Sequence, residues 1–260
     1  MHGWIILDKP YGMGSTDAVS AVKRVFRQGG YGKIKVGHGG TLDPLATGVL
    51  PIALGEATKL TGQMLNGDKT YDFTIAFGVE TDTLDVEGKA VAHSDVRPTL
   101  AQIEAVLPRF TGPIEQVPPS FSALKVHGKR AYDLARAGEE VELASRAVTV
   151  HSLTIQSSPE RGGGPRSGGG EADARIGIEV MTPLPLPHPA DGPPPRSGED
   201  LQSITLTAHV SKGTYIRSLA RDIAQALGTV GHVTMLRRTQ AGPFTLAQAI
   251  SLDKLDEIRQ

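Results

Sequence analysis

The chain has 260 residues, of which 39% are hydrophobic and 21% charged, a composition typical of a soluble globular protein with a substantial core. It contains no cysteine, which excludes disulfides, thiolate nucleophiles and cysteine-ligated zinc, and no segment resembles a signal peptide or a membrane span, so we expect a cytoplasmic protein. The formal net charge of −1 argues mildly against nucleic acid as a partner.

The first third of the chain predicts a strand, a helix and a second strand. Residues 3–10 are an apolar run that closes at a proline, and residues 16–30 carry valines at helical spacing after Ser15 or Thr16 as the cap. Residues 69–78 alternate apolar and polar positions, which is the period of a half-buried strand.

Further along, Thr99 and Gln102 have the spacing of a capping box at the start of a helix over 99–110. A short helix follows over 132–138. We predict three more strands and two more helices from periodicity, at 147–155, 174–182, 203–211, 214–228 and 251–260.

Two low-complexity runs, residues 157–173 and 183–200, are rich in glycine or proline and have little to bury. They flank one predicted strand, and a single strand is no domain. We therefore predict mobile loops within one domain that spans residues 1–260.

Basic residues are clustered although the net charge is close to zero. The clusters are Lys23, Arg24, Arg27, Lys33 and Lys35; Lys125, Lys129, Arg130 and Arg136; and Lys212, Arg217, Arg221, Arg237 and Arg238. On one common face they would form a phosphate-binding surface, whereas charge alone favours three separate solvated faces.

The most distinctive segment is VGHGGTLDPLATGVLPIALGEATKL, a glycine-rich loop around one carboxylate, Asp43, followed by an apolar run. The Asp-Pro pair followed by Gly48 has the form of a helix cap, one helical turn and a stop. Capping explains Asp43 structurally and leaves one carboxylate oxygen free for chemistry.

Motifs of other chemistries are missing from the sequence. It has no dinucleotide or Walker-type phosphate loop, no serine-hydrolase elbow and no closely spaced pair of histidines. The acidic run in residues 78–88 does not have the spacing of a calcium loop and reads as a solvated hairpin turn. We therefore expect no metal and no cofactor.

Several motifs together resemble the TruB family of pseudouridine synthases. GHGGTLDPLATGVLPIALGEATKL is similar to the family's catalytic motif, and GWIILDKPYGMGST and KTYDFTIAFGVETDTLDVEG to its first and second motifs. PPSFSALKVHGKRAYDLARAG, VSKGTYIRSLARDIAQALG and HVTMLRRTQAGPF follow in the family's order. The resemblance implies the pseudouridine synthase fold, an α/β (α+β) arrangement with a mixed, mostly antiparallel sheet, flanking helices and a catalytic cleft.

The resemblance also implies the reaction, in which a uridine of tRNA is isomerised at position 55 of the T-loop. The C1′–N1 bond breaks, uracil rotates and C5 joins C1′, without cofactor or cosubstrate. The target base must be flipped out of its stack at a cost of a few kcal/mol. We expect tRNA, through its T-arm, as the partner of a monomeric enzyme.

By resemblance, Asp43 is the nucleophile and attacks either C1′ or the uracil ring, with Arg217 as its cationic neighbour. Tyr71 stacks on the flipped base and takes part in the chemistry, where pattern alone makes it a core aromatic. The other substrate-binding residues are His38, which fills the vacated stack, Tyr215 and Leu236 in the base pocket, and Lys125, Lys129 and Arg130 on the RNA backbone.

Two alternatives stay open at this point. One is a guide-RNA-dependent synthase, which is disfavoured by the segment SALKVHGKRAYDLARAG and by a chain that stops at Gln260 without room for a C-terminal RNA-binding (PUA) domain. The other is an RNA-binding or tRNA-folding module with incidental catalysis. A pure RNA binder would have no need of the Asp43 carboxylate.

Overall fold

The computed structural model describes residues 1–122, 124–126, 129–131, 134, 137, 143–156 and 200–257. They belong to one compact unit formed by residues 1–156 and 195–260. The predicted strand over 174–182, nearly all of both low-complexity runs and most of the predicted helix over 132–138 lie outside the described residues.

A nine-stranded sheet forms the frame of this unit, in the order β1-β3-β12-β4-β11-β10-β7, with β2 added to β3 and β13 to β12. Its strands are β1 (Gly3–Lys9), β2 (Val36–His38), β3 (Thr47–Leu54), β4 (Lys69–Phe77), β7 (Gly112–Gln116), β10 (Arg146–Ile155), β11 (Ser203–Val210), β12 (Gly231–Ala241) and β13 (Phe244–Thr245). Only the β3–β12 pair is parallel, so the predicted mixed, mostly antiparallel sheet is confirmed.

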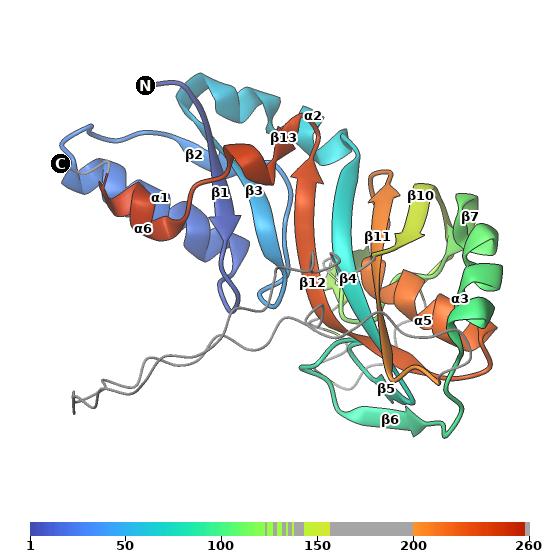
Figure 1. Ribbon diagram of the computed structural model, residues 1–260. Coiled ribbons are helices and arrows are strands. Elements are labelled where there is room, and N and C mark those ends of the chain that lie inside the picture. Colours follow the sequence, from blue (N-terminus) through green and yellow to red (C-terminus); the bar gives the residue numbers. More distant parts are fainter. Residues whose placement is uncertain are drawn as a thin grey trace, which may run out of the picture. The chain divides into compact units, whose positions relative to one another are not determined.

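Helices cover the two ends of the sheet separately. In Figure 1, α5 and α3 lie toward β11, β10 and β7, and α1 and α6 lie toward β1 and β3. The helices are α1 (Ser15–Gln28), η1 (Gly55–Leu60), α2 (Thr61–Asn66), α3 (Leu100–Val106), η2 (Leu107–Phe110), α5 (Ile216–Ala226), η4 (Leu246–Gln248) and α6 (Leu252–Glu257).

Each end of the sheet has its own hydrophobic core, and the two cores adjoin at the middle strands. Ile223 of α5 and Phe73 of β4 are fully buried in one cluster, and Val22 of α1 and Leu50 of β3 in the other. Tyr71 and Leu236 pack against both clusters. These two predicted pocket residues therefore lie at the junction of the two cores.

Local signals set most of the helix boundaries. The capping box predicted at Thr99 is present, because its hydroxyl accepts from Gln102 N and its own N–H donates to the Gln102 side chain. The predicted cap of α1, Ser15 or Thr16, was wrong by one or two residues: Gly14 is the N-cap, and its N–H donates to Asp17 Oδ2 at 3.3 Å. The Ser15 hydroxyl is not free to cap because it binds the Asp43 loop.

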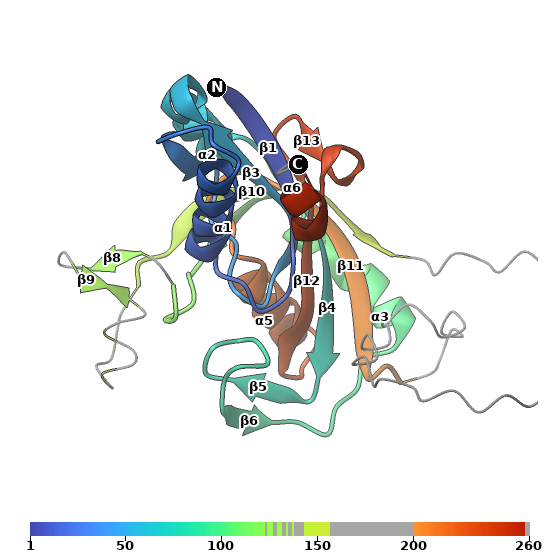
Figure 2. The same ribbon diagram turned by 90° about the vertical axis from the view of Figure 1, so that its left-hand side faces the viewer.

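Two small hairpins accompany the sheet. β5 (Val79–Thr81) pairs with β6 (Ala90–His93), and β8 (Lys125–Val126) pairs with β9 (Lys129–Arg130). Figure 2 shows both hairpins apart from the large sheet. No helix among the described residues is long and apolar enough to cross a membrane.

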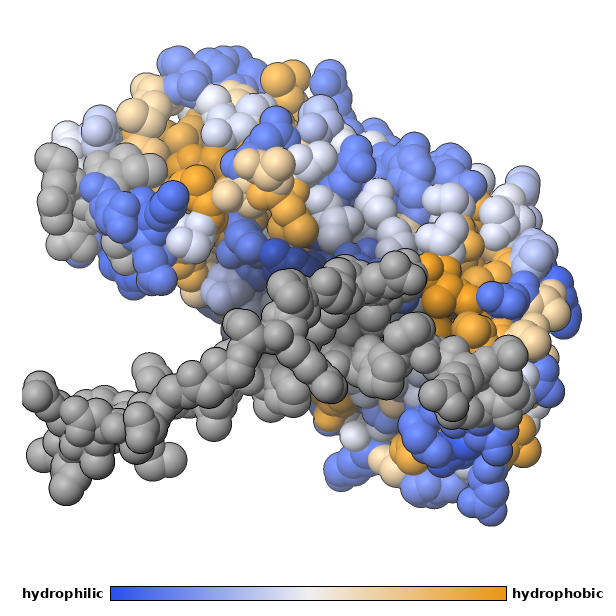
Figure 3. Space-filling view, viewed as in Figure 1, coloured by the Kyte–Doolittle hydropathy of each residue, from blue (hydrophilic) through white to orange (hydrophobic). Residues whose placement is uncertain are grey.

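Hydrophobic side chains also gather at the surface between η2 and β10, where Figure 3 shows an orange area. A shallow groove of about 610 Å³ lies there, lined by Leu107, Leu153 and Ile155 among others. This groove shares no lining residue with the cavities around Asp43 that are described below.

Candidate active site

The loop between β2 and β3 carries Asp43, and polar side chains from two other elements fix its backbone. Ser15 Oγ, at the start of α1, donates to Leu42 O at 2.9 Å and accepts from Leu42 N at 2.8 Å. Lys9 Nζ, at the end of β1, donates to Pro44 O at 3.1 Å. The residues on both sides of Asp43 are thereby held in place.

Arg238 of β12 supports the same loop from inside the protein. This side chain is 1% exposed and donates to Gly40 O at 3.2 Å, Thr41 O at 3.3 Å and Val49 O at 2.8 Å. Gly48 passes so close that a Cβ there would collide with the Arg238 carbonyl oxygen, and its φ of +100° favours glycine independently. The loop therefore packs directly on a buried guanidinium.

The helical turn predicted after Asp43 does not form. Instead, Ala46 N donates to Asp43 O at 3.0 Å and closes a tight, non-helical turn, after which the chain enters β3. Gly48, predicted as a helix stop, lies inside β3. Among the described residues, the Asp43 carboxylate caps no backbone N–H, so the capping interpretation was wrong.

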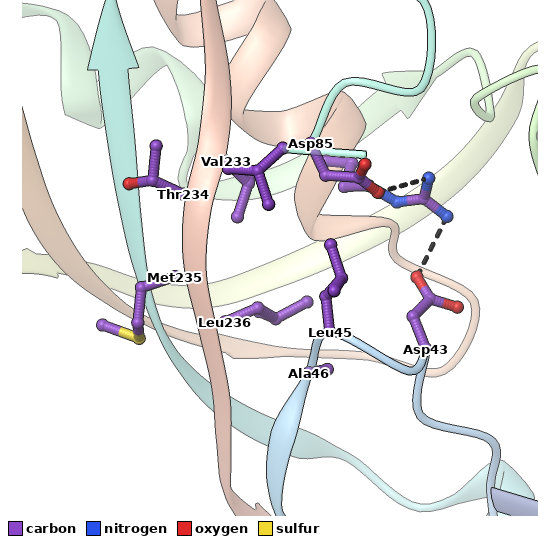
Figure 4. Close-up of a pocket in the computed structure, with 10 residues that line it drawn as sticks. Asp43, Leu45, Ala46, Asp85, Val233, Thr234, Met235 and Leu236 are labelled. Atoms are coloured by element: carbon purple, nitrogen blue, oxygen red, sulfur yellow. Dashed lines mark hydrogen bonds and ion pairs between the residues drawn. The ribbon is translucent and has the colours of Figure 1, made fainter. Parts of the chain in front are cut away.

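The partner of the Asp43 carboxylate is Arg217 of α5, as the resemblance implied. Arg217 Nη2 lies 3.0 Å from Asp43 Oδ2 and donates to Phe121 O at 3.0 Å. Arg217 Nη1 lies 3.1 Å from Asp85 Oδ2 and donates to Thr83 O at 2.8 Å. The dashed lines in Figure 4 mark these two ion pairs, one ending at Asp85 and the other at Asp43.

Two carboxylates thus share one buried cation. Arg217 is 8% exposed, whereas the Asp43 side chain is 48% exposed. A buried cation is tolerated when it is paired and its donors are satisfied, which two carboxylates and two carbonyls achieve here. In return, Arg217 holds one oxygen of the Asp43 carboxylate in place. Among the described residues, Asp43 Oδ1 has no hydrogen-bond partner.

Asp85 is the site residue that sequence reasoning missed. It lies between β5 and β6, in the acidic run predicted as a solvated turn, but it is 9% exposed. Asp85 Oδ1 accepts from Thr83 Oγ1 at 2.6 Å and from Glu87 N at 3.1 Å. Leu84, with a φ of +62°, gives the turn its shape. The prediction was therefore wrong for Asp85, which anchors Arg217.

Two cavities meet at the ion pair, because Asp43 and Arg217 line both. The larger cavity is about 300 Å³, within the range of small-ligand sites, and Tyr71 and Tyr215 line it. The smaller cavity is about 20 Å³ and mostly apolar, and Leu236 contributes to its wall opposite Leu45 (Figure 4). The structure therefore brings together five of the predicted residues.

His38 lies at the end of β2 and lines neither cavity. Its Nδ1 is buried and has no hydrogen-bond partner within the described ranges. Burial, and then the charge of Arg238, lower the pKa of the His38 imidazole below its usual range. The ring is therefore neutral at physiological pH.

The three basic clusters differ in how far their side chains are exposed to solvent. The cluster from Lys23 to Lys35 is exposed, as expected for a solvated or RNA-facing surface. In the third cluster, Arg217 and Arg238 are buried, which contradicts a purely solvated face. Lys125, Lys129 and Arg130 form the β8–β9 hairpin, but their side chains lie outside the described structure.

Buried lysines add to the positive charge near Asp43. Burial lowers the pKa of Lys9 to about 8, although Asp43 raises it in part, and burial together with Arg238 lowers that of Lys69 to about 8. Within the described ranges, no group of three or more histidine, aspartate or glutamate side chains is arranged to hold a metal ion.

Comparison with known proteins defines the class. Residues 23–166 match the TruB family pseudouridylate synthase (N terminal domain), and residues 217–260 match the tRNA pseudouridylate synthase B C-terminal domain. The fold is therefore that of a pseudouridylate synthase.

Curated relatives are similar in sequence to this chain over its whole length. The tRNA pseudouridine synthase B of Novosphingobium aromaticivorans is 59% identical over 260 residues, which are 100% of this chain and 74% of that protein. The tRNA pseudouridine synthase B of Zymomonas mobilis is 53% identical over 261 residues, covering 100% and 72%. The chain belongs to the TruB family.

Solved structures with the same fold include a Cbf5-Nop10-Gar1 complex, with 28% identity, a TM-score of 0.62, and coverage of 98% of this chain and 54% of that chain. An H/ACA RNP bound to a substrate RNA containing 2'-deoxyuridine gives 25% identity and a TM-score of 0.60, covering 98% and 52%. This chain spans about half the length of those chains.

Proposed function

We propose that this protein isomerises uridine to pseudouridine at position 55 in the T-loop of tRNA, with Asp43 as the nucleophile. The observation that carries the proposal is the 3.0 Å pair of Asp43 and Arg217 at the junction of the two cavities. The buried guanidinium holds one oxygen of the half-exposed carboxylate and leaves the other oxygen available to attack, as a nucleophile requires.

The relatives support tRNA as the substrate. Identity is 59% and 53% to proteins named tRNA pseudouridine synthase B, against 28% and 25% to the Cbf5 and H/ACA chains. This difference favours a stand-alone tRNA enzyme over a guide-RNA-dependent one. We expect it to act as a monomer in the cytoplasm.

The reaction rearranges one nucleotide without net change in composition. Asp43 attacks C1′ or the uracil ring, the N1–C1′ bond breaks, and uracil rotates. C5 then bonds to C1′, the bond to the Asp43 carboxylate breaks, C5 loses its proton and N1 gains one. Tyr71 stacks on the flipped base, a contact worth about 1–3 kcal/mol. Tyr215 and Leu236 complete the pocket wall around that base.

The RNA around the target needs its own contacts. His38, which is neutral and flat, fills the stack that the target base leaves. Lys125, Lys129 and Arg130 contact T-arm phosphates from the β8–β9 hairpin, in keeping with recognition of RNA loops by shape and backbone.

The test uses a tRNA transcript tritiated at uracil C5, incubated with wild type, Asp43→Asn and the control Asp82→Asn, which changes an exposed carboxylate of the β5–β6 hairpin. We expect wild type and Asp82→Asn to release tritium from the T-loop uridine and Asp43→Asn to release none. Release by Asp43→Asn would remove Asp43 as nucleophile. Tight binding without release by any of the proteins would favour a tRNA-folding module.

A further inference from the structure

Arg146 of β10 lines the larger cavity together with Asp43, Tyr71 and Tyr215. Its Cζ lies 4.6 Å from the centroid of the Tyr215 ring, a cation–π contact, and its Nη2 donates to Gly213 O. These two interactions hold the guanidinium beside the residue that immediately precedes α5.

The donors of Arg146 are largely unused. A guanidinium has five N–H groups, and within the described residues Arg146 makes one hydrogen bond, while its Nε is buried without any partner. Buried polar atoms without a partner are uncommon in folded proteins and point to a missing ligand or a functional role. No carboxylate of the described residues pairs with Arg146.

The other cations of this cavity are already engaged. Arg217 is paired with two carboxylates, and Arg238 donates to three carbonyls. Lys69 Nζ donates to Leu65 O at 2.7 Å and Gly67 O at 2.5 Å. Arg146 is therefore the cavity cation that has the most donors left for a substrate.

We propose that Arg146 binds a phosphate group that adjoins the flipped uridine. This inference rests on the proposed function, because phosphates are the anionic groups of an RNA substrate. Planar guanidinium groups suit phosphate oxygens, and charge-assisted hydrogen bonds are the stronger kind. The same guanidinium packs on Tyr215, so one side chain links the nucleotide backbone to the wall of the base pocket.

The test is a double-mutant cycle between protein and RNA. T-arm stem-loops carry a neutral methylphosphonate at the linkage 5′ or 3′ to the target uridine, and their affinities are measured for wild type and Arg146→Met. Methionine keeps an apolar stem over Tyr215 but has no donor. The control Arg109→Met removes an exposed cation of η2, which lines neither of these two cavities.

We expect one of the two methylphosphonates to weaken wild-type and Arg109→Met binding about tenfold. Arg146→Met binds the unmodified stem-loop about tenfold more weakly and loses nothing further at that linkage. Its slope of log affinity against log salt is smaller by about 1. Arg146→Lys recovers the salt slope. If Arg146→Met is unfolded at the assay temperature, Arg146→Gln, which also lacks the charge, replaces it.

Equal losses for wild type and Arg146→Met at both linkages would overturn the proposal. The proposal would also be overturned if Arg146→Met bound the stem-loops as tightly as wild type and lost only single-turnover rate. The role of Arg146 would then be confined to positioning Tyr215. Absence of tritium release by wild type would instead refute the proposed function, and the binding cycle would still report on the phosphate contact.

Discussion

Gln116 binds both backbone polar groups of Tyr215: its Oε1 accepts from Tyr215 N at 2.8 Å, and its Nε2 donates to Tyr215 O at 3.2 Å. Gln116 ends β7 and is 1% exposed. Tyr215 is the N-cap residue of α5, and Arg217 follows two residues later. A buried amide thus sets where the helix begins and, through it, where the guanidinium meets Asp43.

We predict that Gln116→Met lowers the free energy of unfolding by about 1–3 kcal/mol, since it leaves the Tyr215 N–H without its partner, whereas Tyr215 O keeps its hydrogen bond from Leu219 N. It also lowers the single-turnover rate, because Tyr215 and Arg217 lose their alignment. Urea unfolding and tritium release measure the two effects. Gln156→Met, at an exposed glutamine, serves as the control. Unchanged kinetics in a destabilised Gln116→Met would limit Gln116 to a structural role.

Asp85→Asn keeps the shape of the side chain that anchors Arg217 but removes its charge. Arg217 is then paired with Asp43 alone and can shift, and the position of the proposed nucleophile Asp43 shifts with it, by an amount that matters for the rate when it approaches about 1 Å. We expect the single-turnover rate to fall at least about tenfold while tRNA affinity stays within about twofold. Glu87→Gln, at an exposed acid of the same turn, should match wild type. A wild-type rate for Asp85→Asn would show that Arg217 needs no second carboxylate.

Periodicity predicted the helices and strands whose apolar faces pack on a core, including α1, α3, α5, β4 and β11. It did not predict β12, a central strand, because two register shifts against β4 break its alternation. Asp85 was misread because its partner Arg217 is 132 residues away and the surrounding acids resemble a solvated turn. Arg238 gave no signal because its acceptors are backbone carbonyls, which no side-chain motif reveals.

The candidate site was identified through motif resemblance rather than local physics. The order Asp-Pro followed by Gly48 fits a capped helical turn, and nothing in that order shows that Arg238 lies against Gly48. The local sequence pattern therefore predicted the wrong backbone conformation at Gly48, because the contact with Arg238 determines that conformation.

Gly48→Ala tests that contact directly. A methyl group there would collide with the Arg238 carbonyl and would also force a side chain into a φ of +100°. We expect a loss of at least about 3 kcal/mol in the free energy of unfolding, or an insoluble protein. Gly62→Ala, in α2 with no atom within 4 Å of the new Cβ, should be neutral or slightly stabilising. Equal melting of the two variants would contradict the close packing at Gly48.

The buried Lys69 predicts a pH dependence of stability. Its pKa is lowered from 10.5 to about 8 in the folded protein, first by burial and then by Arg238. Between pH 8 and pH 10.5 the unfolded chain therefore binds more protons at this residue than the folded protein does, and stability rises with pH in that window. Below pH 8 both states are protonated, and the burial cost of the charge is present in full.

We therefore expect the free energy of unfolding of wild type, relative to Lys69→Met, to rise by on the order of 2 kcal/mol between pH 7.5 and pH 10. Urea unfolding at several pH values measures it, and taking the difference between the two proteins cancels the other titrating groups. Lys23→Met, at an exposed lysine of α1, reports the general effect of losing one cation. A difference between wild type and Lys69→Met that stays constant with pH, or falls as pH rises, would show that Lys69 keeps its ordinary pKa in the folded protein.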